Sequence, residues 1–584
     1  MKELFAGRKE QWYNRGIAAL FVIGLWMFLA VFFDFYYDLN DDTAMKDILS
    51  GTYTGVPDGH SIQMLYPLGF CISILYKMMP VIPWYGIFLC GCQFLAVWIC
   101  FCSLLRQSAV GSRKKTGLLL LTAATGSLFL YELIFIQYTV TAGLLAVAAL
   151  VRLCASPKAG ETGFFRYHIV TIVLIVLAFY LRTEMLLLLC PFLGIAGLWQ
   201  IFGECAQEKD VLSKRNIWIR YSLLAVCVLV LIGVGMLTDR AAYSSPEWKS
   251  FRQFFDDRTS VYDFYGIPDY EVHREFYEEI GLSEAEYTLL INYNFDLDEE
   301  INTETLSRLA EYAAQIQEQG MLHRLYLSAY TYVYRFVHGQ EIIFDLLLAV
   351  SYFFLAKVAL RGKRPQLLGK LVLLFSMRTA IWLFLLYMGR VPERITHPLY
   401  LIELALLGML FLLDTKALQW KKYEKSAILS MYILLFVCTA VYQVQTVSEK
   451  YAVREETNLQ WQKWKEYCRS NPQQFYYLDV YSSVAYSEKL FLDVSPDYRN
   501  FDLAGGWCVK SPLTAEKRGI MSFENAKDGL LSGKAFFVTD AERAERSSEF
   551  LIPWYREKGN EVVVKEIDDC GSFSIFRVTE VARN

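Results

Sequence analysis

Charged residues and the familiar motifs of soluble enzymes are scarce in this sequence. Asp, Glu, Lys and Arg make up 20% of its 584 residues, the formal net charge is -4, and six residues are histidine. This charge balance argues against a nucleic-acid partner, which would require concentrated positive charge. There is no Walker loop, no GxGxxG after an expected strand, no GxSxG and no CxxC. The common nucleotide, serine-hydrolase and thiol-redox sites are therefore not predicted.

The cysteines and histidines do not form a metal-binding pattern. Most of the thirteen cysteines lie inside apolar runs, where they act as small hydrophobic residues. Cys468, Cys508 and Cys570 lie in the C-terminal part with neither CxxC nor zinc-type spacing, so we expect at most one disulfide among them. No two histidines have metal-ligand spacing. A divalent metal cofactor stays an open possibility, and its ligands are unknown.

What the sequence has in abundance is apolar residues. Hydrophobic residues make up 54% of it and aromatic residues 16%, which is typical of a multi-pass membrane protein with polar parts outside the membrane. A helix needs about 20 apolar residues to cross a bilayer. We expect about eleven such spans, near 16–33, 83–105, 117–131, 134–151, 168–181, 184–202, 220–237, 341–360, 371–388, 396–413 and 426–444.

The distribution of Lys and Arg sets the expected orientation. These residues gather at the N-terminus and in the loops 106–115, 152–166, 209–215, 361–364 and 416–425. All of them are cytoplasmic only if the segment 65–79 does not cross the membrane. We therefore expect 65–79 to be a re-entrant or interfacial helix, the first span to be uncleaved, the N-terminus to be cytoplasmic and the C-terminus extracytoplasmic, in a bacterial cell membrane.

This topology divides the chain into four parts. Residues 1–237 form a transmembrane core whose first external loop, 34–82, is acidic; 238–340 is a large, partly helical external loop; 341–444 holds the last spans; and 445–584 is an external α/β domain. In that domain the apolar runs 475–478, 535–538, 561–564 and 572–578 predict strands. The pattern also predicts a helix over 541–551, capped by Asp540 and stopped before Pro553.

Two adjacent carboxylates, Asp41 and Asp42, follow the first span. Carboxylates at the membrane surface are costly unless a cation, a hydrogen-bond network or a water-filled cavity receives them. One of them has the chemistry of a general base that takes a proton from an acceptor hydroxyl, and the proximity of two carboxylates raises the pKa of each. A structural alternative is that Asn40 and Asp41 cap the helix that follows.

Arginines mark the ends of later spans. Arg182 lies between two apolar runs, and Arg390 and Arg394 lie in a tight external loop, where they depart from the positive-inside trend. A guanidinium can hold phosphate oxygens through two parallel hydrogen bonds, so we expect donor-phosphate binding here. The structural alternatives are pairs with Glu184 and Glu393.

Three further residues are weaker candidates. Glu132 and Gln137 lie in and after a short external turn and are candidates to line a polar cavity, with Glu132 as a second acid or metal ligand. Arg378 lies inside an expected span, so it must face the bundle interior or a cavity. The sequence does not separate substrate binding from structural pairing for Arg378.

Taken together, these motifs resemble those of the GT-C superfamily of membrane glycosyltransferases, such as lipid A aminoarabinose transferases and protein O-mannosyltransferases. The resemblance covers about 34–200 and 370–415. It rests on an acidic pair in the pattern D-[DE]-x₅-I at 41–48, a Pro-containing short helix at 66–70, the basic Arg182, and an Arg-x-x-x-Pro element at 394–398. One departure is that the position of a second Asp in related enzymes reads Gln137-Tyr138-Thr139, which leaves a second acid and its metal in doubt.

The resemblance implies a sugar donor linked to a polyprenyl phosphate and an external acceptor glycan, cell-wall polymer or lipid. Asp41 would then be the base, Asp42 its support, and Arg182 and Arg394 the phosphate ligands. No nucleotide site is expected. The alternatives are a transporter or flippase of lipid-linked sugars, a polymerase or ligase of lipid-linked glycans, and a non-enzymatic assembly protein. We find no internal repeat of the kind that transporters show.

Overall fold

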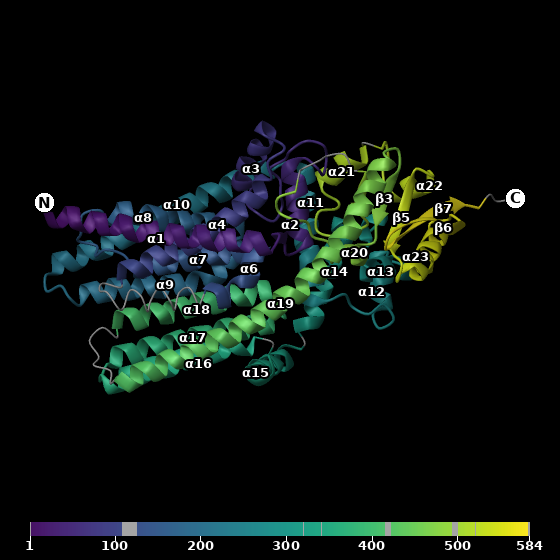
Figure 1. Ribbon diagram of the computed structural model, residues 1–584. Helices are drawn as coiled ribbons and strands as arrows, with labels where there is room; N and C mark the ends of the chain where they lie inside the picture. Colours follow the sequence, from purple (N-terminus) through teal and green to yellow (C-terminus); the bar gives the residue numbers. More distant parts are fainter. Residues whose placement is uncertain are drawn as a thin grey trace.

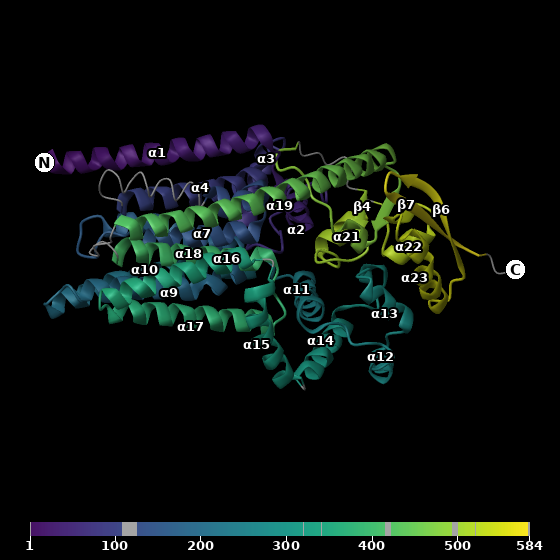
Figure 2. The same ribbon diagram turned by 60° about the horizontal axis from the view of Figure 1, so that its bottom comes forward.

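The computed structural model describes residues 2–107, 125–318, 320–339, 341–414, 422–492, 500–519 and 521–581. It consists of a bundle of long helices and a mixed helical and β part at one end of that bundle (Figures 1 and 2). The N-terminus lies at the far end of the bundle, and the C-terminus lies in the mixed part (Figure 1). The three segments expected outside the membrane therefore gather at one end.

Nine helices in the described part of the chain are long and apolar enough to cross a membrane. Large apolar side chains such as Leu20 and Val31 are exposed on the outer surface of the bundle, where lipid would cover them. The protein is thus an α-helical, polytopic membrane protein. These helices are α1 (Lys2–Phe32), α4 (Trp84–Gln107), α8 (Phe164–Leu181), α9 (Thr183–Cys205), α10 (Val211–Ala242), α16 (Ile342–Arg361), α17 (Pro365–Tyr387), α18 (Glu393–Asp414) and α19 (Lys422–Ser470).

A shorter apolar helix, α7 (Tyr138–Cys154), occupies the centre of the bundle. It packs against α4, α8, α9 and α18, and almost all of its residues are buried. A Cβ atom on Gly143 would lie 2.4 Å from Cβ of Pro398, so glycine allows α7 and α18 to pack this closely. The expected span 117–131 begins in 108–124, outside the described residues, and stays a prediction.

The last bundle helix, α19, differs from expectation. The span was expected to end near residue 444, but the same helix continues to Ser470. The continuation contains no Gly or Pro, and the next proline is Pro472, so nothing breaks the helix. Trp461, Trp464 and Cys468 form a buried stripe on it, which anchors the external domain directly to a membrane helix.

The first external segment is held by a small sheet. Strand β1 (Tyr36–Tyr37) pairs in parallel with β2 (Phe135–Ile136), which follows the short helix α6 (Leu130–Ile134). The expected span 134–151 therefore starts later than predicted, because its first residues form this strand. Helix α2 (Asn40–Ser50) follows β1, and α3 (Tyr66–Met78), at 13 residues, is too short to cross a bilayer.

The segment between α10 and α16 is helical and packs on the external side. Its buried aromatic residues, such as Phe254 and Phe295, belong to one core with the C-terminal domain. The elements are α11 (Pro246–Thr259), the π-helix η1 (Ser260–Tyr265), α12 (Arg274–Ile280), α13 (Glu284–Ile291), the 3₁₀-helix η2 (Phe295–Leu297), α14 (Thr303–Glu318) and α15 (Met321–His338).

The C-terminal domain is a five-stranded mixed sheet in the order β4-β3-β5-β7-β6. Four strands match the expected runs, and β4 was not predicted. The strands are β3 (Phe475–Leu478), β4 (Phe501–Leu503), β5 (Ala535–Asp540), β6 (Val562–Cys570) and β7 (Phe573–Glu580). The domain's helices are α20 (Val480–Ser483), α21 (Pro512–Gly519), α22 (Ala526–Leu531) and α23 (Ala544–Glu557).

Helix α23 corrects the expected helix 541–551. It starts later, without a side-chain cap, and passes through Pro553 to Glu557. Proline removes one helical hydrogen bond, but Leu551, Trp554 and Tyr555 are fully buried on the same helix. Burial of these large side chains offsets the lost bond. All thirteen cysteines fall within the described residues, and each is unpaired.

Candidate active site

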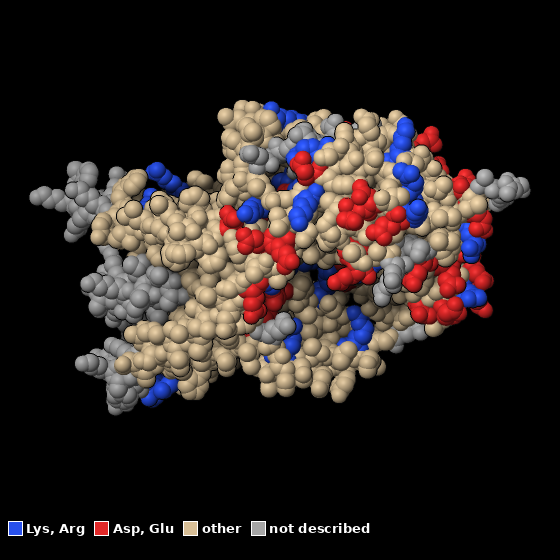
Figure 3. Space-filling model, turned by 45° about the vertical axis from the view of Figure 1, so that its right-hand side comes forward, with Lys and Arg blue, Asp and Glu red and all other residues tan. Residues whose placement is uncertain are grey.

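A cavity of about 840 Å³ lies where the external ends of the membrane helices meet α2, α11, η1 and the C-terminal domain. Charged residues gather over this external part, whereas the visible face of the bundle is almost free of charge (Figure 3). The cavity has a charged region and an apolar region. The apolar residues that the membrane helices and the loop before α18 contribute to its lining are Met185, Leu188, Phe384, Leu385, Met388 and Ile395.

The small sheet and α2 position the acidic pair. Tyr37 pairs with Ile136 in the small sheet, and the next residue, Asp38, extends this pairing: its N–H donates to the Ile136 carbonyl at 3.0 Å. Helix α2 then starts at Asn40, so both Asp41 and Asp42 lie in its first turn, where the helix dipole stabilises carboxylates. The expected capping by Asn40 and Asp41 is wrong, because Leu39 is the N-cap and no side chain caps it.

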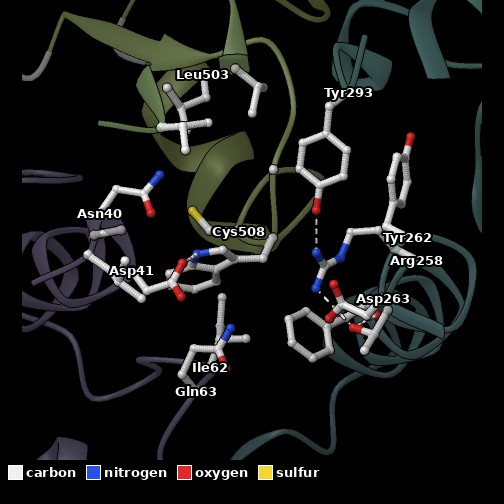
Figure 4. A pocket seen from close by; sticks show the side chains of 18 of the residues that line it. Asn40, Asp41, Ile62, Gln63, Arg258, Tyr262, Asp263, Tyr293, Leu503 and Cys508 are labelled. Atoms are coloured by element: carbon white, nitrogen blue, oxygen red, sulfur yellow. Dashed lines mark hydrogen bonds between the residues drawn. The ribbon is translucent and has the colours of Figure 1, made fainter. Parts of the chain in front are cut away.

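The two carboxylates have different surroundings. Asp41 lines the cavity, and its Oδ1 accepts a hydrogen bond from Trp507 Nε1 at 2.9 Å (Figure 4). Asp42 is fully buried and does not line the cavity; its Oδ1 accepts from Tyr85 Oη at 2.9 Å and from the Tyr138 N–H at 3.2 Å. Burial raises the pKa of Asp42 well above its usual range, and the nearby Asp41 charge adds to this.

Arg182 is the single extended residue between α8 and α9. This break turns its side chain into the cavity, where Nη1 donates to Gln63 Oε1 at 2.6 Å and Nε lies 3.0 Å from Glu184 Oε2. Because Glu184 has 71% of its side chain exposed, this pair is weak in energy. The guanidinium also lies 5.4 Å from the ring centroid of Tyr138.

The other two predicted arginines enter the same cavity from the start of α18 and the loop before it. Arg390 lies 3.0 Å from Asp263 Oδ1. Arg394 is half-buried, and among the described residues it has no carboxylate oxygen within 4.0 Å. The cavity therefore brings together four of the predicted site residues: Asp41, Arg182, Arg390 and Arg394.

The three weaker candidates lie elsewhere. Glu132 is buried with His397, whose Nδ1 lies 2.5 Å from Glu132 Oε1. Gln137 caps α7 by accepting from the Val140 N–H at 2.9 Å. Arg378 is buried in the bundle between Asp345, at 2.7 Å, and Glu403, at 2.9 Å. None of the three lines the cavity, and a substrate or metal role for them stays a prediction.

Arg258 is one of several polar cavity residues that sequence reasoning missed. Arg258, near the end of α11, is 6% exposed and lines the cavity opposite α2. The sequence signal is its place on a buried helical stripe with Phe251 and Phe254, since an arginine at i, i+4 of an apolar stripe is unusual.

A group of three carboxylates with metal-like spacing lies away from the cavity. Glu286, Asp298 and Glu300 are close together in the described part of the chain. Lys558 Nζ lies 2.5, 3.0 and 2.8 Å from them, respectively. The ammonium group of Lys558 thus occupies the position that a metal ion would take among these carboxylates.

Comparisons with known proteins give limited information. No protein-family model matches the sequence, and no curated protein matches it. Among solved structures, the chain is similar to ArnT from Cupriavidus metallidurans, in a crystal structure of that protein bound to undecaprenyl phosphate. The match covers 96% of this chain and 98% of ArnT, at 10% sequence identity and a TM-score of 0.39. This score is low, so the functional argument rests on the chain's own residues.

Proposed function

We propose that this protein is a membrane glycosyltransferase that moves a sugar from a polyprenyl-phosphate donor to an extracytoplasmic glycan, cell-wall polymer or lipid. The observation that supports it is one cavity lined by carboxylates, Asp41 among them, by four arginines and by apolar side chains. A lipid-linked sugar phosphate needs all three, because it has a lipid chain, an anionic phosphate and a carbon that an acceptor hydroxyl attacks.

Arg394 and Arg182 are the proposed ligands of the donor phosphate. Within the described ranges Arg394 has no carboxylate partner, and Arg182 has only an exposed one, Glu184. Both are therefore able to pair with phosphate oxygens without breaking a strong ion pair. Arg390 is a weaker candidate for this role, because it is already paired with Asp263. The apolar lining from α9 and α17 would receive the first isoprene units of the donor.

Asp41 is the proposed general base. As the acceptor oxygen bonds to the anomeric carbon, the bond from that carbon to the phosphate oxygen breaks. The acceptor proton passes to Asp41, and the negative charge on the leaving lipid phosphate is held by Arg182 and Arg394. Trp507 orients the carboxylate through its hydrogen bond. Asp42, fully buried, would support the fold of the first turn of α2 instead of touching substrate.

The test is sugar transfer from a panel of synthetic polyprenyl-phosphate sugars, with the protein in nanodiscs. Asp41→Asn should lower transfer by about 10²–10⁴-fold, the usual contribution of a general base. Asp34→Asn is the matched control, since Asp34 lies in the same external segment, is exposed and pairs with Lys489 outside the cavity. Equal transfer by Asp41→Asn and the wild type would remove Asp41 as the base.

A further inference from the structure

Arg258 is a buried cation whose hydrogen-bond partners among the described residues are hydroxyl groups. Its Nη2 donates to Thr259 Oγ1 at 2.9 Å, and its Nη1 donates to the hydroxyl of Tyr293. Its buried Nε has no hydrogen-bond partner. In the described part of the chain no carboxylate oxygen lies within 4.0 Å of it. The acidic residues of the same wall lie farther away, and one of them, Asp263, holds Arg390.

This arrangement is costly in a protein without its ligand. A buried guanidinium loses its hydration, and neutral hydroxyl groups replace only part of that interaction. Helix α11 continues directly into the π-helix η1, so Arg258 does not lie at a free helix C-terminus that would compensate its charge. Two other arginines of the cavity have carboxylate partners: Arg390 pairs with Asp263, and Arg182 pairs with Glu184. The missing partner of Arg258 is therefore expected to come from a bound molecule.

Arg258 lies across the cavity from Asp41, the proposed general base. Figure 4 shows Asp41 on one side of the hollow and Arg258 on the other, with the hydroxyl of Tyr293 against the guanidinium. Arg258 belongs to the external segment and not to the membrane helices. Aromatic rings surround it: Phe255 lies 4.9 Å below the guanidinium, and Tyr262 packs edge-on against Tyr293, with ring centroids 4.2 Å apart.

We infer that Arg258 binds an anionic group, a phosphate or a carboxylate, on the acceptor substrate. The inference rests on the proposed transferase function, which assigns Arg394 and Arg182 to the donor. It narrows the acceptor to an anionic glycan, polymer or lipid. The anion on Arg258 would place a hydroxyl of the same molecule toward Asp41 across the cavity.

The first experiment measures anion binding without any reaction. The full-length protein in nanodiscs is saturated with a synthetic polyprenyl phosphate, which occupies the donor site, and is titrated with inorganic phosphate, acetate or chloride while its melting temperature is measured. We expect phosphate, acetate or both to raise the melting temperature saturably. Arg258→Gln should weaken this response about tenfold or more, as expected for loss of a hydrogen bond to a charged group. Arg258→Lys should be intermediate.

Arg252→Gln is the matched control. Arg252 lies on the same helix but outside the cavity, and it already has a carboxylate partner in Asp239 at 2.6 Å. The melting temperature of the Arg252→Gln variant should rise with added anion as that of the wild type does. A response to phosphate alone indicates a phosphorylated acceptor, and a response to acetate as well indicates a carboxylate. No response above chloride, or an equal response in Arg258→Gln, would overturn the inference, as would a lower basal melting temperature with the anion response intact.

The second experiment links the anion to the acceptor. In the transfer assay, Arg258→Gln should raise KM for the acceptor about tenfold and leave KM for the donor unchanged. A change in donor KM instead would contradict the assignment. If no donor in the panel is used although the anion response depends on Arg258, the transferase proposal fails and the anion site stands.

Discussion

Arg378 and Arg258 are almost equally buried, at 3% and 6% exposure, but their surroundings differ. Arg378 lies in the bundle with two carboxylates, Asp345 and Glu403, and with the Tyr332 hydroxyl, which accepts from Nη1 at 2.9 Å. Arg258 lies in the cavity with hydroxyl partners only. A buried arginine that is paired with carboxylates indicates a role in stability. A buried arginine that lines a cavity without a carboxylate partner indicates a binding site for an anionic ligand.

The largest effect on stability is expected for Arg378, which is paired with two buried carboxylates. Arg378→Gln should destabilise the protein by about 3–5 kcal/mol, because it leaves two buried carboxylates without their cation. Denaturation in detergent micelles, followed by intrinsic fluorescence, measures this loss. The double variant with Glu403→Gln should lose less than the sum of the two single variants. An unchanged stability of Arg378→Gln would contradict the structural role that distinguishes Arg378 from Arg258.

A smaller effect is expected at the hydrogen bond that reaches Asp41 from the C-terminal domain. Trp507→Phe keeps an aromatic ring but removes the Nε1–H donor. It should lower kcat about fivefold to tenfold, the value of one hydrogen bond to a charged group, with the melting temperature unchanged. Trp464→Phe offers a control in the same part of the chain, since its Nε1 has no partner. A kcat loss in both variants would indicate a general effect on the domain.

The smallest effect is expected for the second carboxylate. Because the pKa of Asp42 is raised in the folded protein, the native state holds a proton that the unfolded chain releases above about pH 4. Stability from this group is therefore present at low pH and declines as pH rises toward the folded pKa. Because Asn does not titrate, Asp42→Asn should flatten this decline and be at least as stable as the wild type at neutral pH. Melting temperature against pH tests it; a steeper decline in the variant would contradict it.

Much of the fold could be predicted from the sequence, because apolar runs of about 20 residues have few alternatives to a membrane helix. The strands at 475–478 and 535–538 were also predictable from short apolar runs. The long α19 was not, since its external half has no hydrophobic periodicity strong enough to separate a continuing helix from a linker. The helix end expected before Pro553 is wrong for a related reason: tertiary burial of Trp554 and Tyr555 outweighs the local preference of proline.

The candidate site was predictable in part. Asp41, Arg182, Arg390 and Arg394 lie at the ends of apolar runs, so the sequence places them at the membrane surface, and the cavity contains all four. Arg378 and Arg258 show why the rest could not be predicted. Whether a buried arginine has a carboxylate partner depends on helices far apart in the sequence: the partners of Arg378 come from α16 and α18. The orientation of the chain in the membrane stays a prediction.

The most direct test of the account is the binding of a synthetic polyprenyl phosphate to the purified protein, measured by native mass spectrometry or microscale thermophoresis. The Arg394→Gln variant should bind the polyprenyl phosphate about tenfold more weakly, with an unchanged melting temperature. The substitution removes a positive charge that lines the cavity at the proposed phosphate position. The control Arg252→Gln should bind like the wild type. Equal binding by Arg394→Gln and the wild type would contradict the claim that the unpaired arginines of this cavity hold anionic substrates.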